Sequence, residues 1–308
     1  KPVVAVIGTT GVGKSHLALC LAKRFNGELI NTDALQMYRG LPIATNKPTA
    51  DEVAAAPHHL VGVWAPDVTG SIVAFSEQVH AAIDAIHARG KLPIIVGGTS
   101  YYVQAALWTN NTSPDNAGET SSDTALRAHA ADMRRLAHAV DPVMAARYHA
   151  ANLRRLHRIL TVYAASGRPM SAALTARPAP VLRYPTLVLW PFQSTEALYP
   201  RLDARVDAMV ARGLLAELRD FHATWTAMPH VAPDQRHQVG LGQAIGYKEM
   251  AAYLALLDAG GPDGAATKPA EVETALTQGL DLVKQSTRRY AKRQLTWIRN
   301  KIAPALLQ

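Results

Sequence analysis

A glycine-rich segment near the amino terminus has the spacing of a phosphate-binding loop. Gly8-Thr-Thr-Gly-Val-Gly-Lys14-Ser15 matches the pattern G-x-x-x-x-G-K-[ST] and follows a short β-branched run at 3–7. Glycines let backbone N–H groups converge on phosphate oxygens, and the lysine adds a positive charge. The Ser15 hydroxyl is a suitable oxygen ligand for Mg²⁺. The segment therefore predicts a phosphate site formed by Gly8, Thr9, Thr10, Gly11, Val12, Gly13, Lys14 and Ser15, without showing whether phosphate is transferred, hydrolysed or expelled.

Two further polar segments follow predicted strands at 28–32 and 92–96. The carboxyl ends of parallel strands meet at one edge of a sheet, so Asp33 and the segment Gly97-Gly-Thr99 should lie beside the phosphate site. Asp33 could ligate Mg²⁺, act as a general base or cap a helix. The paired glycines could admit a ligand, or they could form only a tight turn between strand and helix.

Basic residues are concentrated in two parts of a chain whose formal net charge is +8. Residues 127–158 contain seven arginines and two aspartates, and residues 284–301 contain seven basic side chains and no acidic one. Arg154 and Arg158 are four residues apart, which places them on one face of a helix. These segments predict contact with a polyanion, although solvated helix faces would carry the same charges.

Two other spacings have more than one interpretation. Arg201 and Arg205 alternate with Asp203 and Asp207, so they could bind an anion or form ion pairs within their own helix. Tyr290 and Trp297 share a helix face, where they could stack on bases or pack in a core.

Alternating strand and helix patterns indicate the architecture. We expect strands at 3–7, 28–32, 92–96 and 186–190, with helices at 14–25 and 75–88. This order predicts an α/β fold with a P-loop NTPase-like parallel sheet flanked by helices. An Ala/Arg/His-rich stretch interrupts the pattern. We therefore expect a catalytic core from 1–108 and 181–308, including the C-terminal helices, and an inserted helical subdomain at 109–180 that binds nucleic acid.

Composition excludes several classes of protein. Hydrophobic residues make up 48% of the chain and charged residues 18%, a balance that excludes a mostly disordered protein. Apolar runs are too short to cross a bilayer, so we expect no membrane interaction. Cys20 is the single cysteine, so neither a disulfide framework nor a cysteine zinc cluster can form within the chain. We expect a monomer in a reducing compartment, the cytoplasm, with the mitochondrion as an additional location.

Taken together and in order, these motifs resemble the tRNA dimethylallyltransferases, also called tRNA isopentenyltransferases. The segment 33–47, beginning Asp-Ala-Leu-Gln-Met-Tyr-Arg-Gly, is similar to the D-S-M-Q-V-Y-[RK]-G stretch of that family. The variants Thr-Asn-Lys and Gly-Gly-Thr-Ser-Tyr-Tyr resemble eukaryotic, fungal-like members, whose C-terminal zinc finger is absent from these residues. Asn152 and Ala34 stand where the family usually has Asp and Ser. Other matching blocks are Pro57–His59, Gly97–Tyr102, Arg201–Asp207, Ala244–Glu249 and Thr287–Trp297.

The resemblance implies transfer of a dimethylallyl group from dimethylallyl diphosphate to N6 of adenine 37, beside the tRNA anticodon, with Mg²⁺ as cofactor. It implies that Asp33 is the general base and that Thr10, Lys14 and Arg205, with Arg201, hold the diphosphate. It implies base flipping, because the adenine must leave the anticodon stack. The residues it assigns to the tRNA anticodon stem-loop are Asp33, Ala34, Leu35, Gln36, Thr99, Arg154, Arg155, Leu156, His157, Arg158, Arg288, Arg289, Lys292 and Arg293.

Three alternatives remain at this point. An adenylate isopentenyltransferase would perform the same transfer onto free AMP, ADP or ATP. A P-loop small-molecule kinase would turn over nucleotide without using dimethylallyl diphosphate. An RNA-binding protein with a vestigial loop would perform no chemistry. The two basic segments favour tRNA over a free nucleotide, which needs neither of them.

Overall fold

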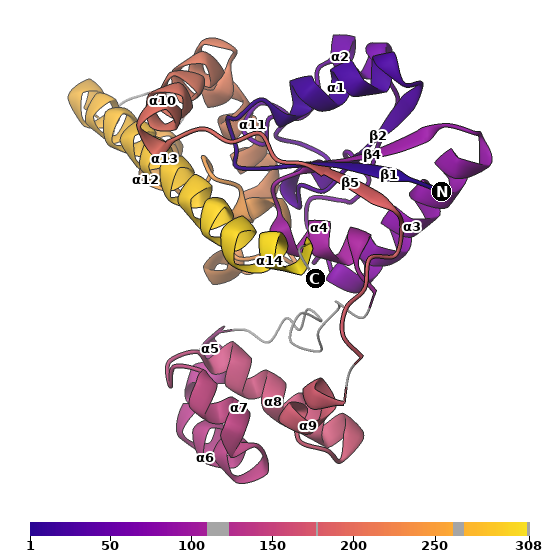
Figure 1. The fold of residues 1–308 in the computed structure, drawn as a ribbon. Helices are drawn as coiled ribbons and strands as arrows, with labels where there is room; N and C mark the ends of the chain where they lie inside the picture. The colour runs from indigo at the N-terminus through magenta and orange to yellow at the C-terminus, as the bar shows by residue number, and fades with distance from the viewer. Residues whose placement is uncertain (110–122, 177, 261–267, 307–308) are drawn as a thin grey trace.

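A parallel β-sheet forms the centre of the computed structural model, which describes residues 1–109, 123–176, 178–260 and 268–306 (Figure 1). The strand order is β3-β2-β4-β1-β5, and each neighbouring pair is parallel. This confirms the predicted α/β fold. A two-residue strand was not predicted, because so short a segment carries no periodic pattern. The strands are β1 (Val3–Ile7), β2 (Gly27–Asn31), β3 (His58–His59), β4 (Leu92–Gly97) and β5 (Thr186–Leu189).

Helices cover both faces of the sheet. On one face α1 (Lys14–Arg24) buries Ala18 and Ala22 against Ile94 of β4. On the other face lie α3 (Ile72–Ala88) and α4 (Ser100–Leu107), and their apolar residues join the cluster that contains Ile95. Because β4 is covered on both faces, its sequence is apolar throughout rather than alternating. Along the chain, η1 (Leu35–Met37) and α2 (Ala50–Ala55) lie between β2 and β3.

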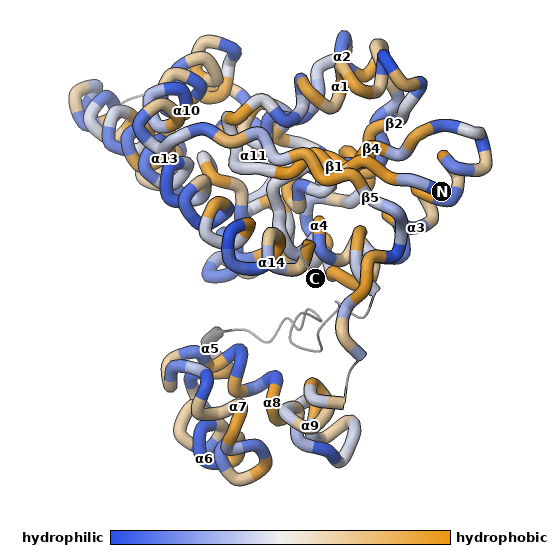
Figure 2. Tube along the Cα trace, viewed as in Figure 1, coloured by the Kyte–Doolittle hydropathy of each residue, from blue (hydrophilic) through white to orange (hydrophobic). Residues whose placement is uncertain are grey.

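The C-terminal helices close the carboxyl edge of the sheet. Leu198 and Leu202 of α10 (Thr195–Ala211) pack with Ala291 of α13 (Pro269–Trp297) and with Val12 of the glycine-rich loop. The hydropathy of the chain follows this layering, with hydrophobic strands and a mixed α13 (Figure 2). Within the described ranges, no helix is both long and apolar enough to cross a membrane. The remaining elements here are α11 (Leu214–Thr226), η3 (Pro233–Gln235), η4 (Gly240–Gln243), α12 (Ala251–Gly260), the π-helix η5 (Ile298–Ile302) and α14 (Ala303–Leu306).

Among the described residues between α4 and β5, five helices lie apart from the sheet (Figure 1). Their apolar residues, including Met144, Ile159 and Met170, form a hydrophobic cluster of their own. Buried Asp141 joins two of them, because it accepts hydrogen bonds from the backbone N–H groups of Met144 and Ser171. Their independence as a subdomain spanning 109–180 stays a prediction. The helices are α5 (Asp123–Ala128), α6 (Ala130–Val140), α7 (Pro142–Arg147), α8 (Leu153–Ser166) and α9 (Met170–Thr175).

Candidate functional site

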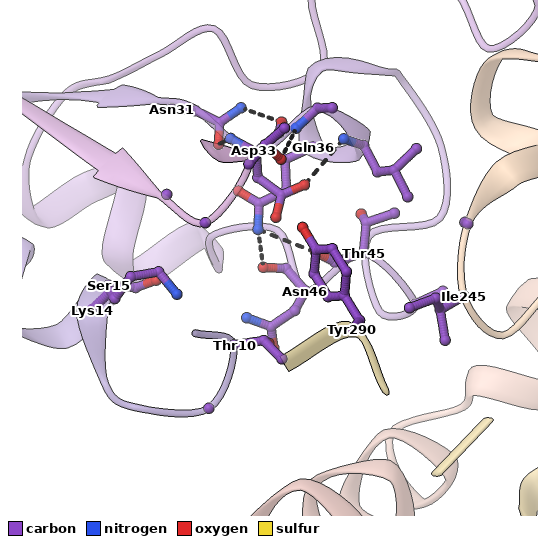
Figure 3. A pocket seen from close by; sticks show the side chains of 18 of the residues that line it. Thr10, Lys14, Ser15, Asn31, Asp33, Gln36, Thr45, Asn46, Ile245 and Tyr290 are labelled. Carbon is purple, nitrogen blue, oxygen red and sulfur yellow. Dashed lines mark hydrogen bonds between the residues drawn. The ribbon is translucent and has the colours of Figure 1, made fainter. Parts of the chain in front are cut away.

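A single cavity of about 870 Å³ brings together segments that are far apart in the sequence (Figure 3). Its lining includes residues of the glycine-rich loop, of the turn after β2 and of the turn after β4. Side chains from α10 and α13 complete it. The predicted meeting of these turns at the carboxyl edge of the sheet is therefore observed. The predicted site residues on this lining are Thr10, Gly11, Gly13, Lys14, Ser15, Asp33, Ala34, Leu35, Gln36, Thr99, Arg201, Arg205 and Arg293.

The glycine-rich loop has the backbone conformation of a phosphate cradle. Gly11 and Gly13 have φ values of +84° and +90°, a left-handed conformation that favours glycine. The Lys14 ammonium donates a hydrogen bond to the Thr9 carbonyl at 2.7 Å. Burial lowers the pKa of Lys14 to about 8, Arg205 adds to this effect, and the negative charge of Asp33 opposes it. A bound anion would stabilise the protonated form of this lysine.

Asp33 places a carboxylate in the cavity, beside Lys14 and Arg205. Burial raises its pKa, whereas hydrogen bonds from the backbone of Leu35 and Gln36 and the charges of Lys14 and Arg205 lower it. Its Oδ1 accepts the Leu35 N–H at 3.0 Å, which is the bond of an Asx-turn. The helix-cap interpretation does not hold for η1, whose N-cap is Ala34 and which has no side-chain cap hydrogen bond. Asn31 was missed by sequence reasoning; its side chain accepts the Asp33 N–H at 2.8 Å and donates to the Asp33 carbonyl at 3.0 Å. Asn31 thus holds the backbone of Asp33, and the Leu35 N–H holds its carboxylate.

The arginines of α10 line the cavity, whereas their acidic neighbours pair with α13. Asp203 accepts a hydrogen bond from Arg288 of α13 at 2.7 Å, and Asp207 forms an ion pair with Lys284 at 2.7 Å. Ion pairs do form, as one of the two interpretations held, but they join α10 to α13 rather than residues within α10. Arg205 instead donates a hydrogen bond to the Thr10 hydroxyl at 3.1 Å. The tRNA contact predicted for Arg288 would therefore compete with Asp203 for the Arg288 guanidinium.

Gln294 of α13 connects the glycine-rich loop to the turn after β4. Its Oε1 accepts the Thr10 N–H at 2.8 Å, and its Nε2 donates to the Gly98 carbonyl at 2.9 Å. A Cβ on Gly98 would lie 2.1 Å from this Nε2, and one on Gly97 would lie 2.3 Å from the Thr32 hydroxyl. The paired glycines therefore make room for the protein's own side chains. An amide within a basic helix carries no spacing signal, so sequence reasoning missed Gln294.

Tyr290 and Thr99 also belong to the cavity. Thr99 Oγ1 accepts the Ala34 N–H at 3.1 Å, which joins the turns after β2 and β4. Burial and the nearby charge of Asp33 raise the pKa of Tyr290, which keeps its phenol protonated. Trp297, seven residues later, packs instead against Tyr101 with ring centroids 4.2 Å apart. Of the two aromatic residues on this helix face, Tyr290 therefore lines the cavity, whereas Trp297 packs against another aromatic ring.

The predicted basic face of α8 does not reach the cavity. Leu156 is 2% exposed within the helical cluster, so its assignment to a tRNA contact is wrong. It occupies the apolar side of an amphipathic helix, whereas the arginines around it lie on the other sides. Arg154 donates a hydrogen bond to Gln238 at 2.9 Å, and the Arg155 guanidinium lies 5.7 Å from the centre of the Tyr148 ring.

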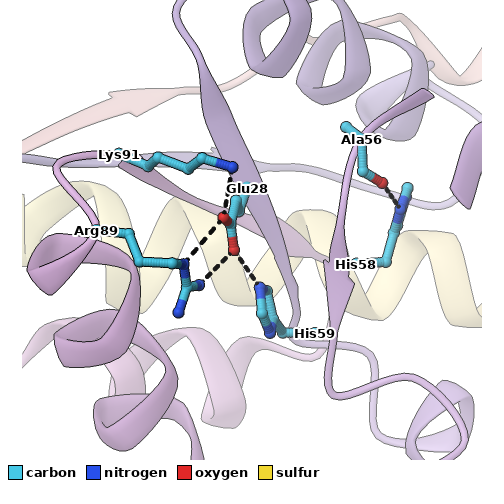
Figure 4. Close-up of polar contacts among 6 residues, drawn as sticks. All are labelled: Glu28, Ala56, His58, His59, Arg89 and Lys91. Atoms are coloured by element: carbon cyan, nitrogen blue, oxygen red, sulfur yellow. Dashed lines mark hydrogen bonds and ion pairs between the residues drawn. The ribbon is translucent and has the colours of Figure 1, made fainter. Parts of the chain in front are cut away.

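The adjacent histidines His58 and His59 have structural partners. His59 contacts the buried carboxylate of Glu28 at 2.6 Å, and Arg89 and Lys91 form ion pairs with the same group (Figure 4). Burial alone would raise the pKa of Glu28, but hydrogen bonds from these three side chains lower it to about 2. Across the described residues, no group of three or more His, Cys, Asp and Glu side chains is placed to hold a metal ion.

Comparisons with known proteins agree on one family. The family model described as IPP transferase matches residues 36–301. A tRNA dimethylallyltransferase of Mus musculus is 37% identical over 97% of this chain and 66% of its own length, and one of Geobacillus kaustophilus is 38% identical over 98% and 89%. A crystal structure of a eukaryotic dimethylallyltransferase acting on tRNA superposes with a TM-score of 0.82 at 32% identity, covering 99% of this chain and 72% of that chain. The chain thus spans about two thirds of the length of the mouse relative.

Proposed function

Because the chain belongs to the IPP transferase family, we propose that it transfers a dimethylallyl group from dimethylallyl diphosphate to N6 of adenine 37 in tRNA. The reaction forms a bond between N6 and C1 of the dimethylallyl group and releases diphosphate. One observation carries the proposal: the carboxylate of Asp33 shares a cavity with the cations Lys14 and Arg205. This arrangement places a proton acceptor beside groups that can stabilise an anionic leaving group.

Asp33 acts on the acceptor. The exocyclic amine of adenine is a weak nucleophile, and it becomes cationic as it attacks C1 unless its proton is removed. A carboxylate within hydrogen-bond reach can accept that proton in the transition state. Burial raises the pKa of Asp33, which makes it a stronger base than an exposed aspartate. Its hydrogen bonds to the turn η1 hold it in place for this step.

The glycine-rich loop and α10 act on the leaving group. As the bond between C1 and oxygen breaks, negative charge accumulates on diphosphate. Lys14, Arg205 and the loop N–H groups stabilise that charge, and Arg201 lines the same cavity at its α10 wall. Mg²⁺ would neutralise part of the diphosphate charge. The exposed Ser15 hydroxyl at the start of α1 fits a Mg²⁺ ion that is held otherwise by phosphate oxygens and water.

The acceptor is a base in an RNA loop rather than a free nucleotide. The turn at Ala34–Gln36, with Thr99 and Tyr290, offers polar and aromatic surface for a flipped adenine. Exposed Arg289, Lys292 and Arg293 on α13 and the arginines of α8 would contact phosphates of the anticodon stem. An adenylate isopentenyltransferase would need neither of these two basic surfaces. The protein acts as a monomer in the cytoplasm or the mitochondrion, reducing compartments that fit its single cysteine.

Incubation with radiolabelled dimethylallyl diphosphate, Mg²⁺ and either unmodified tRNA or AMP tests the proposal. We expect label in tRNA, and we expect it to disappear when adenine 37 is replaced by another base. Label in AMP alone would assign the chain to the adenylate-modifying branch. Absence of label from both acceptors, together with ATP turnover, would support a kinase and refute the proposed transfer.

A further inference from the structure

A loop beside the cavity is anchored by a carboxylate from a distant helix. Glu217, in the first turn of α11, accepts the Ile43 N–H at 2.7 Å on Oε1 and the Ala44 N–H at 2.8 Å on Oε2. Both oxygens of one carboxylate are therefore used by two successive backbone donors. Hydrogen bonds to a charged acceptor are roughly twice as strong as neutral ones. Glu217 thus fixes the position of this loop, which spans residues 41–47.

The anchor matters because the loop is tightly curved and strained. Leu41 and Asn46 have φ values of +47° and +51°, a left-handed conformation that costs energy for residues other than glycine. Internal hydrogen bonds close the curve, including Thr45 N–H to the Leu41 carbonyl at 3.0 Å and Lys47 N–H to the Pro42 carbonyl at 2.9 Å. The surrounding structure must maintain such a conformation, and Glu217 supplies two of the bonds that do so.

The loop determines how the amide of Gln36 is oriented in the cavity. Its Nε2 donates to the carbonyls of Thr45 at 3.1 Å and of Asn46 at 2.8 Å (Figure 3). A carbonyl oxygen can only accept, so the NH₂ end of the amide must face the loop. Both amide hydrogens are then used within the protein. Oε1 remains as the group of Gln36 that can bind a ligand, and it can act only as an acceptor.

We propose that Glu217 is a positioning residue for base recognition, which holds loop 41–47 so that Gln36 presents a hydrogen-bond acceptor to an N–H group of the substrate base. The inference rests on the proposed transfer to tRNA. Without the anchor, the two carbonyls would no longer hold the amide, and Gln36 could rotate to present its NH₂ group. The base would then meet a donor where it requires an acceptor, and such a mismatch leaves polar groups unpaired.

The test compares Glu217→Gln, Gln36→Ala and the double variant in the full chain. Glutamine at position 217 keeps the size of the side chain but places an NH₂ group against a backbone N–H. Asp220→Asn is the matched control, because Asp220 is an exposed acidic residue of the same helix whose side chain pairs only weakly with Arg219, at 3.8 Å. The measured quantities are kcat and KM for an anticodon stem-loop and for dimethylallyl diphosphate, with the melting temperature of each variant.

We expect Glu217→Gln to raise KM for the stem-loop by about tenfold, the effect of losing the one hydrogen bond between the Gln36 amide and the base. KM for dimethylallyl diphosphate and the Asp220→Asn kinetics should stay within about twofold of the wild type. In the Gln36→Ala background, Glu217→Gln should add little, because the amide it positions is already gone. The inference would be overturned if the increases in KM of the two single variants multiplied in the double variant. It would also be overturned if Glu217→Gln raised KM equally for the stem-loop and for dimethylallyl diphosphate. Failure of the wild-type chain to modify tRNA would instead refute the proposed function, and the inference with it.

Discussion

Replacement of Gln294 by leucine tests whether this buried amide holds the glycine-rich loop in its active position. Gln294 is 4% exposed and makes two hydrogen bonds to backbone groups of different turns, those of Thr10 and Gly98. Leucine has a similar volume and can make neither bond. The Thr10 N–H and the Gly98 carbonyl would therefore lose their partner in a place that water does not readily reach.

The magnitude follows from the two groups left unpaired. Each buried polar group without a partner costs about 1–3 kcal/mol, so the two together cost about 2–6 kcal/mol. The buried leucine side chain returns about 1–2 kcal/mol of hydrophobic stabilisation. We expect Gln294→Leu to lower the free energy of unfolding by about 1–4 kcal/mol. Because Thr10 also accepts the hydrogen bond of Arg205, its displacement should lower kcat/KM for dimethylallyl diphosphate by about 100-fold.

Urea denaturation and steady-state kinetics measure these two effects. Gln285→Leu is the matched control, because Gln285 is a half-buried residue of the same helix that does not line the cavity. The reasoning would be refuted if Gln294→Leu unfolded within about 0.5 kcal/mol of the wild type. It would also be refuted if the variant kept wild-type kcat/KM for dimethylallyl diphosphate.

Three other predictions concern the proposed reaction. Asp33→Asn should lower kcat by about 10²–10⁴-fold while the affinity for the stem-loop, measured by fluorescence anisotropy, changes little, and near-normal turnover would contradict its role as base. Because the pKa of Lys14 is lowered to about 8, the charge that binds diphosphate is present below that pH and is lost as pH rises through it. We expect kcat/KM for dimethylallyl diphosphate to fall above this pH, and Lys14→Arg, but not Lys47→Arg, should remove the fall because arginine stays charged. Arg158→Gln and Lys292→Gln should each reduce the salt dependence of tRNA binding by about one phosphate contact, and an unchanged slope would exclude the contact concerned.

The sequence by itself determined the features that depend on neighbouring residues. The spacing from Gly8 to Ser15 required a strand before it and a helix after it, and both are present in β1 and α1. The position of Asp33 after a buried strand was enough to place it at the carboxyl edge of the sheet, beside that loop. These predictions succeeded because local backbone geometry and the parallel sheet leave few other places for such residues.

Only the tertiary structure decided which distant side chains complete the site. Gln294 contacts Thr10 across 284 positions of sequence, and Glu217 contacts Ile43 across 174. Neither residue type has a spacing that marks its partner. Likewise, Asp203 is two residues from each of two arginines of its own helix. It nevertheless pairs with Arg288 of α13. Helix packing sets these distances, and a chain read in one dimension contains no record of which helix faces meet.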